Sequence, residues 1–166
     1  MKVKDAMNPE VITVSPGQTL KEVSHVFHEN GISGAPVLDS NGMVVGVISD
    51  SDVVRAVEPH QETLRLRYPS LSLMSVTFDR DVEERSLDEV CREVQQKPVK
   101  EFMTGEVVSL APDDTIETAV TLMNQSGFNR LPVIEGDQLV GILTRADILR
   151  CLTKADLSFL DAVEER

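Results

Sequence analysis

Two stretches of this sequence repeat each other, and this repeat limits the folds open to the chain more than any other feature. Val3-Lys4-Asp5-Ala6-Met7 corresponds to Val99-Lys100-Glu101-Phe102-Met103, and further matched positions follow at the same spacing of 96 residues. Later pairs, such as Gly46 with Gly141, lie 95 residues apart. The one-residue slip falls in a segment rich in Gly, Asn and Asp, where a hairpin turn tolerates a change of length. The chain therefore contains two copies of one unit.

Each copy carries the hydrophobic pattern of a β-α-β-β-α unit. In the first copy a β-branched run at 11–14 ends before Pro16 and predicts a short strand. Thr19 opens a helix with apolar residues every three or four positions, and Gly31 is expected to end it. Apolar segments at 35–38 and 43–48 predict two more strands, and Ser49 starts a second helix. The second copy repeats this order, with Thr115, Gly127, strands at 131–134 and 138–143, and Thr144 in the matching places. The expected fold is mixed α/β.

Four segments follow from the repeat. They are a first copy at 1–57, an insert at 58–98, a second copy at 99–153 and a tail at 154–166. The capping-box pattern Ser86-Leu87-Asp88-Glu89 opens an amphipathic helix in the insert, and Pro98 closes it. We expect this helix to pack beside the second copy, and the tail to continue or follow the last helix.

The composition excludes several classes of protein. The chain has 166 residues, a formal net charge of −12 and 41% apolar residues. This acidity opposes general attraction to nucleic acid, although a local pocket for one small anion is compatible with it. No apolar run approaches the roughly 18 residues of a membrane span, and the first residues lack the apolar core of a signal peptide. The expected location is the cytoplasm, with neither nucleic acid nor membrane as a partner.

Each copy has a hydroxyl and a carboxylate at the junction between a strand and a helix, Ser49 with Asp52 and Thr144 with Asp147. A hydroxyl at the N-cap and a carboxylate three residues later can simply complete the helix end. The same groups also suit a ligand, because a helix N-terminus favours an anion and a carboxylate accepts hydrogen bonds from ribose hydroxyls. The two interpretations are compatible.

Taken together, the repeated motifs resemble the cystathionine-β-synthase (CBS) domain, and the tandem pair resembles a Bateman module. The resemblance rests on the following residues of the two copies: Met7 and Met103, Pro16 and Pro112, Gly31 and Gly127, Pro36-Val37 and Pro132-Val133, and the segments 46–52 and 141–147. It covers nearly the whole chain except the insert and the tail.

The resemblance implies two domains packed sheet against sheet about a pseudo-two-fold axis, with two clefts between them. Many members of the family bind AMP, ADP, ATP, S-adenosylmethionine or related adenosine compounds there, many pair into dimers, and most regulate an enzyme or a transporter. Their base pockets are built from the first strand and the start of the second. In this chain those residues are Ile12, Thr13, Ala35 and Pro36 in one copy and Val108, Ser109, Leu131 and Pro132 in the other. The alternative for all eight is ordinary sheet core.

The two copies differ in charge where a phosphate would bind. The second copy has Arg130 and Arg145 where the first has Gly34 and Asp50. Arg suits phosphate through its paired donors, whereas Asp50 would repel it. We therefore expect unequal sites, the tighter one using Thr144 and Asp147. The alternative for both arginines is solvated surface charge.

No enzyme motif stands out. His25 and His28 alternate with the apolar residues Val26 and Phe27, so they are read as a solvated helix face, with a metal site as the alternative. Cys91 and Cys151 are read as plain thiols, because they match no metal-binding spacing. The sequence thus predicts a regulatory module that binds an adenine nucleotide, without a catalytic cofactor. The alternatives are a ligand-free interaction scaffold and a binder of S-adenosylmethionine or methylthioadenosine.

Overall fold

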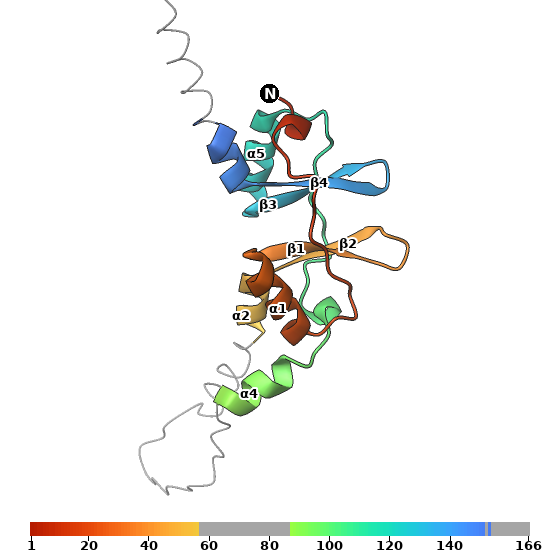
Figure 1. Cartoon of the computed structure of the whole chain (residues 1–166), viewed down its shortest axis with the longest axis vertical. Coiled ribbons are helices and arrows are strands. Elements are labelled where there is room, and N and C mark those ends of the chain that lie inside the picture. Colours follow the sequence, from red (N-terminus) through yellow and green to blue (C-terminus); the bar gives the residue numbers. More distant parts are fainter. Residues whose placement is uncertain (57–86, 152, 154–166) are drawn as a thin grey trace, which may run out of the picture. The chain divides into compact units, whose positions relative to one another are not determined.

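A computed structural model describes residues 1–56, 87–151 and 153 (Figure 1). The described residues belong to two compact units. One contains residues 1–13, 36–47 and the second copy from 105 onward, and the other contains 14–35, 48–56 and 87–104. Most of the predicted insert, the start of its capping box and the predicted tail lie outside the described residues.

The two copies contain the same elements in the same order. The first has α1 (Leu20–Asn30), β1 (Gly34–Leu38), β2 (Val44–Ser49) and α2 (Asp50–Arg55). The second has α5 (Ile116–Ser126), β3 (Arg130–Glu135), β4 (Gln138–Thr144) and a helical stretch at 145–151. The predicted mixed α/β fold class is therefore confirmed. No helix among the described residues is long and apolar enough to cross a membrane.

Caps define the ends of the first helix in each copy. The side chains of Thr19 and Thr115 accept hydrogen bonds from the backbone N–H groups of Glu22 (3.3 Å) and Thr118 (3.2 Å). Gly31 and Gly127 then end the helices with φ of 61° and 75°, a left-handed conformation that glycine adopts without a steric cost. Both boundaries agree with the prediction.

The predicted first strands are wrong. Residues 11–13 and 107–109 have no regular structure. In the second copy only Leu110 reaches the sheet, donating to the carbonyl of Pro132 (3.0 Å) and accepting from the N–H of Ile134 (2.8 Å). A turn closed by Asp114, whose carboxylate accepts from the N–H of Ala111 (2.7 Å), then takes the chain away from the sheet. The β-branched run is long enough for a strand, but the chain lies beside its partner at only one residue.

The hairpin of β3 and β4 is antiparallel, with Arg130 opposite Thr144 and an irregularity after Val133. Asn8 pairs with Ile142 on the side of β4 away from β3. The N–H of Asn8 donates to the carbonyl of Ile142, and the N–H of Ile142 donates to the carbonyl of Asn8, each at 2.9 Å. A segment from the start of the chain thus becomes part of the second copy's sheet.

The opening segments of the two copies are exchanged. The 3-10 helix Val3–Asp5 bonds to the second copy, with Val3 N–H donating to Asp114 (2.8 Å) and Lys4 N–H to Pro112 (3.0 Å). The 3-10 helix Val99–Glu101 bonds to the first copy at the equivalent positions, with Val99 donating to Gln18 (2.8 Å) and Lys100 to Pro16 (3.1 Å). Each copy is therefore completed by the beginning of the other.

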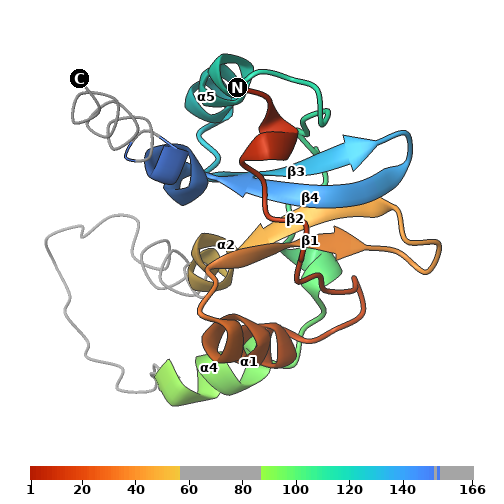
Figure 2. The same cartoon turned by 45° about the horizontal axis from the view of Figure 1, so that its top comes forward.

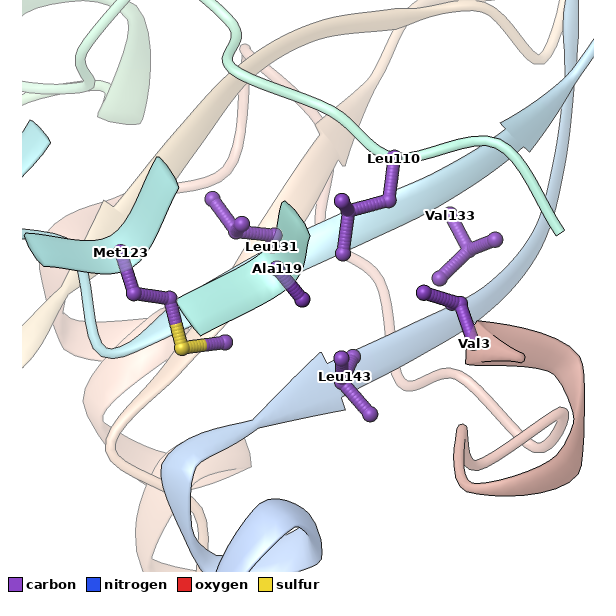
Figure 3. Close-up of a cluster of buried hydrophobic side chains, with 7 residues drawn as sticks. All are labelled: Val3, Leu110, Ala119, Met123, Leu131, Val133 and Leu143. Carbon is purple, nitrogen blue, oxygen red and sulfur yellow. The ribbon is translucent and has the colours of Figure 1, made fainter. Parts of the chain in front are cut away.

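Val3 is an integral part of the second copy's core. It is fully buried and clusters with six residues of that copy: Leu110, Ala119, Met123, Leu131, Val133 and Leu143. Figure 3 shows Val3, carried by the N-terminal 3-10 helix, beside Val133 and Leu143 of the hairpin.

The helix of the insert, α4 (Leu87–Val94), does not lie where the sequence predicted. The chain directly after it is bonded to the first copy, because the N–H of Lys21 donates to Gln95 (2.9 Å) and that of Leu20 to Lys97 (3.0 Å). The end of α4 therefore adjoins α1 (Figure 2) and not the second copy. The exchange explains the correction, since the chain between α4 and residue 104 belongs with the first copy.

Candidate functional site

In the second copy the junction between β4 and the following helix is closed by Thr144 and Asp147. Oδ2 of Asp147 accepts from the backbone N–H of Thr144 (2.8 Å) and from its hydroxyl (2.6 Å). The N–H of Asp147 donates back to the Thr144 hydroxyl (3.3 Å). Oδ1 accepts from Nη2 of Arg150 at 3.0 Å. This carboxylate is buried, and its partners balance its charge and polarity.

The first copy repeats this arrangement. Oδ2 of Asp52 accepts from the N–H and the hydroxyl of Ser49, both at 2.8 Å, and Oδ1 accepts from Nη2 of Arg55 at 2.6 Å. Asp52 and Asp147 are the only buried charged side chains among the described residues, each 6% exposed. The capping interpretation of both pairs is thus what the structure shows, and a ligand would have to bind to a junction that is already hydrogen-bonded.

The backbone amides at these junctions are largely engaged too. The N–H of Arg145 donates to the carbonyl of Asn129 (3.0 Å), and the N–H of Asp50 donates to that of Ser33 (3.0 Å). In the second copy the N–H groups of Thr144, Arg145 and Asp147 all have partners, so an anion there would depend on side chains more than on the helix end. The Thr144 hydroxyl still has lone-pair capacity as an acceptor.

Both predicted arginines lie at this same end of the β3–β4 hairpin. Arg130 is the first residue of β3 and faces Thr144 in the strand register, and Arg145 directly follows Thr144. Arg130 is half-buried, while Arg145 is exposed. The structure therefore brings together the four polar residues that the sequence selected for the second copy. The first copy has Gly34, which is buried, and exposed Asp50 at the matching places.

The residues predicted for the base pockets divide into two groups. Four of them are buried, namely Ala35, Pro36, Leu131 and Pro132, and Leu131 belongs to the core cluster. The other four lie in irregular segments: Ile12 and Val108 are half-buried, and Thr13 and Ser109 are exposed. Ordinary core packing thus accounts for the first group, and the accessible members of the second group are left as candidates for contact with a ligand.

The sequence reasoning missed two features of the junctions. Arg55 and Arg150 align with each other in the repeat, and their spacing of three residues from Asp52 and Asp147 was a signal for the ion pairs. The second feature is a close approach to the backbone at Gly141. The group that approaches it is Met7, because a Cβ at position 141 would overlap its Sδ and lie 3.0 Å from its Cγ.

The histidine and cysteine side chains of the described residues form no metal site. Among the described residues no cluster of His, Cys, Asp or Glu could hold a metal ion. His25 and His28 are exposed on α1, Cys91 is exposed and Cys151 is half-buried, and both thiols are free.

The chain matches known proteins over most of its length. A family model described as "CBS domain" matches residues 3–59 and 99–154, one match for each copy. The protein MJ1426 of Methanocaldococcus jannaschii is 36% identical over 154 residues, which is 92% of this chain and 91% of that protein.

Two solved structures have the same fold. CBSX2, a chloroplastic protein of Arabidopsis thaliana, was solved in complex with AMP; it is 25% identical with a TM-score of 0.67, covering 93% of this chain and 98% of that one. The CBS domain pair of MJ0100, in complex with 5′-methylthioadenosine and S-adenosyl-L-methionine, has a TM-score of 0.69 at 20% identity over the same shares. At that identity the second likeness shows the fold alone.

Proposed function

This chain belongs to the CBS domain family, as a tandem pair, and from this premise we propose that it is a cytoplasmic regulatory module that binds an adenine nucleotide and thereby modulates a partner protein. The observation that carries the proposal is the likeness to CBSX2, whose structure contains AMP and which aligns with nearly all of this chain. The family match is to a regulatory module, which supports a role in control rather than in catalysis.

The second copy is the better site in this proposal. Arg130 and Arg145 bind the phosphate, and Thr144 and Asp147 contact the ribose. Guanidinium groups form charge-assisted, paired hydrogen bonds with phosphate oxygens, which are among the strongest polar contacts in proteins. In the first copy Ser49 and Asp52 offer the same ribose contacts, but Asp50 repels a phosphate. The base lies against the predicted apolar positions, of which Val108 and Ile12 are accessible in part.

The arginine pair favours a nucleotide over S-adenosylmethionine. S-adenosylmethionine has no phosphate, and Arg130 and Arg145 would repel the positive sulfonium charge that lies near its ribose. Its one anionic group, the methionine carboxylate, lies at the far end of the side chain beyond that charge. AMP, ADP and ATP all present at least one phosphate to the same pair.

Isothermal titration of the full chain with AMP, ADP, ATP, adenosine and S-adenosylmethionine tests this proposal. We expect the nucleotides to bind more tightly than adenosine, which lacks the phosphate. R145D gives the second copy the residue of the first, and D50R is the matched reverse change. We expect R145D to weaken AMP binding about tenfold or more, from the loss of one charge-assisted contact and the gain of repulsion, while D50R strengthens the weaker site.

Each other outcome has a meaning. If no adenosine compound binds at millimolar concentration, the protein is an interaction scaffold and the proposal is wrong. If S-adenosylmethionine binds and AMP does not, the ligand class is wrong. If R145D weakened the binding of AMP and of adenosine equally, Arg145 would not contact the phosphate. We also propose that the protein is a homodimer, which sedimentation equilibrium tests. We further propose that its target is an enzyme or a transporter, which affinity capture from the source cells tests.

A further inference from the structure

An ionic cluster holds the beginning of the chain to the second copy. Nζ of Lys2 and Nζ of Lys4 lie 2.7 Å and 2.9 Å from the same oxygen, Oδ1 of Asp113. The two lysines lower the pKa of Asp113 from 3.8 to about 2, mainly through their hydrogen bonds. The carboxylate is therefore ionised at every physiological pH and keeps both partners.

The same segment continues to the strand that leads into the candidate site. After Val3 enters the core, Met7 packs over Gly141 and Asn8 pairs with Ile142 through both backbone hydrogen bonds, each 2.9 Å. Thr144 follows Ile142 by only two residues on β4. The free side of β4 beside the candidate site is thus covered by residues 7 and 8, so the position of this segment fixes that of the strand end.

The first copy lacks this ionic cluster. Its equivalent segment contains Lys100 in the place of Lys4, but Pro98 stands in the place of Lys2 and Gly17 in the place of Asp113. Among the residues that the structure describes, Lys100 forms no ion pair. The backbone exchange is common to both copies, whereas the ionic cluster is found only in the copy that also carries Arg130 and Arg145.

We infer that residues 1–8 are a positioning segment for the ligand site of the second copy, and that Lys2 and Lys4 on Asp113 keep this segment docked when the ligand binds. The inference rests on the proposed function for the ligand, and on the ion pairs and backbone hydrogen bonds of residues 1–8 for the docking. A docked segment presents Thr144 in one fixed place. An undocked segment leaves the edge of β4 unpaired and the space beside Gly141 empty, so the ligand must order the strand as it binds, which lowers its affinity.

The size of the effect follows from the exposure of the ion pairs. All three side chains are about half exposed or more. Exposed pairs contribute little each and are screened by salt, so the two pairs together shift docking by about two- to tenfold. Burial of Val3 still favours the docked segment when the ion pairs are lost, so the fold survives the loss of the cluster and undocking becomes only more frequent.

The test reverses the charge of Asp113. D113K in the full chain repels both lysines, and the triple variant K2E/K4E/D113K restores the attraction with opposite signs. K100E is the matched control in the first copy. At low salt we expect D113K to weaken AMP binding about two- to tenfold, the triple variant to recover most of it, and K100E to leave it unchanged. Added positive charge by itself would strengthen binding of an anion, so weaker binding has to come from the segment.

Hydrogen exchange gives a second readout that needs no ligand. The amide protons of Asn8 and Ile142, which form the two bonds between the segment and β4, should exchange about two- to tenfold faster in D113K and return toward the wild-type rate in the triple variant. Unchanged exchange at these two amides overturns the ionic docking. Faster exchange with unchanged AMP affinity overturns the positioning role. If the wild-type chain binds no nucleotide, the proposed function fails, and the exchange rates still decide whether the cluster holds the segment.

Discussion

Buried carboxylates are costly unless both oxygens have partners, and Asp52 and Asp147 meet this condition within seven residues of chain. Each accepts from the N–H and hydroxyl of the cap residue and from an arginine three residues later. All these partners are local, so the helix end is complete before any ligand arrives. A ligand at this junction therefore meets a preorganised group rather than a free carboxylate.

Asp147→Asn should consequently lower stability. The amide oxygen can keep the bonds from Thr144, but the NH2 group then faces Arg150, and a buried donor meets a cation. The expected loss in the free energy of unfolding is about 1–3 kcal/mol, with a similar loss for Asp52→Asn. Urea denaturation followed by circular dichroism measures both. Asp137→Asn in the exposed hairpin turn is the control, and Asp147→Asn unfolding at the same urea concentration as this control would contradict the argument.

The sequence predicted these junction residues because a cap is a local pattern, visible in the spacing of Ser49 and Asp52 alone. It also named Arg130 and Arg145 as candidates for contact with phosphate, but it left open which cleft each arginine faces. The register that places Arg130 opposite Thr144 comes from the structure. The sequence could not assign the reason for Gly141. The close neighbour of that glycine, Met7, is distant in sequence, and no periodicity connects the two residues.

Among the elements, β4 depends most on a distant contact. Met7 fills the space over Gly141 so closely that a Cβ there overlaps its side chain. Gly141→Ala should therefore displace Met7 or bend the strand, at a cost of about 1–3 kcal/mol. Gly105→Ala is the matched control, because nothing lies within 4 Å of a Cβ at that position.

Thermal unfolding of four variants separates the cause. Gly141→Ala should lower the melting temperature and Gly105→Ala should not. Met7→Ala should also lower it, but adding Gly141→Ala to Met7→Ala should cost less than Gly141→Ala alone, because the overlap is gone. Strictly additive effects would show that Met7 is not the group that requires glycine.

Prediction at the level of elements worked where the signal was continuous. Both long helices and both hairpins have apolar periodicity, caps or turn residues that agree with one another, and their positions were correct. The strands expected at 11–14 and 107–109 failed, because a strand requires a neighbour along its length and Leu110 has one only at a single position. The predicted packing of α4 was wrong for a related reason. An amphipathic pattern shows that a helix has one apolar face, but it does not show which copy that face contacts.

For the whole molecule, the exchange of opening segments makes each copy depend on the other. Val3 belongs to the first copy by sequence but lies in the core of the second, and Val99 has the mirrored position, bonded beside Gln18 and fully buried. The repeat thus identifies two sets of matching elements, but the opening segment of each copy is bonded to the other copy. An intact second copy requires residues 1–8 as well as those from 105 onward.

This exchange predicts a crossed pattern of destabilisation. Val3→Ala removes two buried methyl groups from the cluster around Leu110 and Leu143, at a cost of roughly 1–3 kcal/mol. Amide protons in α5 and β3 should then exchange about ten- to a hundredfold faster where exchange requires opening of this unit, while those in α1 change less. Val99→Ala should do the reverse, with the larger increase in α1. Hydrogen exchange followed by mass spectrometry resolves the two regions in one experiment on each variant. If each substitution instead loosened the copy to which it belongs by sequence, the exchanged arrangement of the openings would be wrong, and with it the dependence of the second copy's ligand site on the start of the chain.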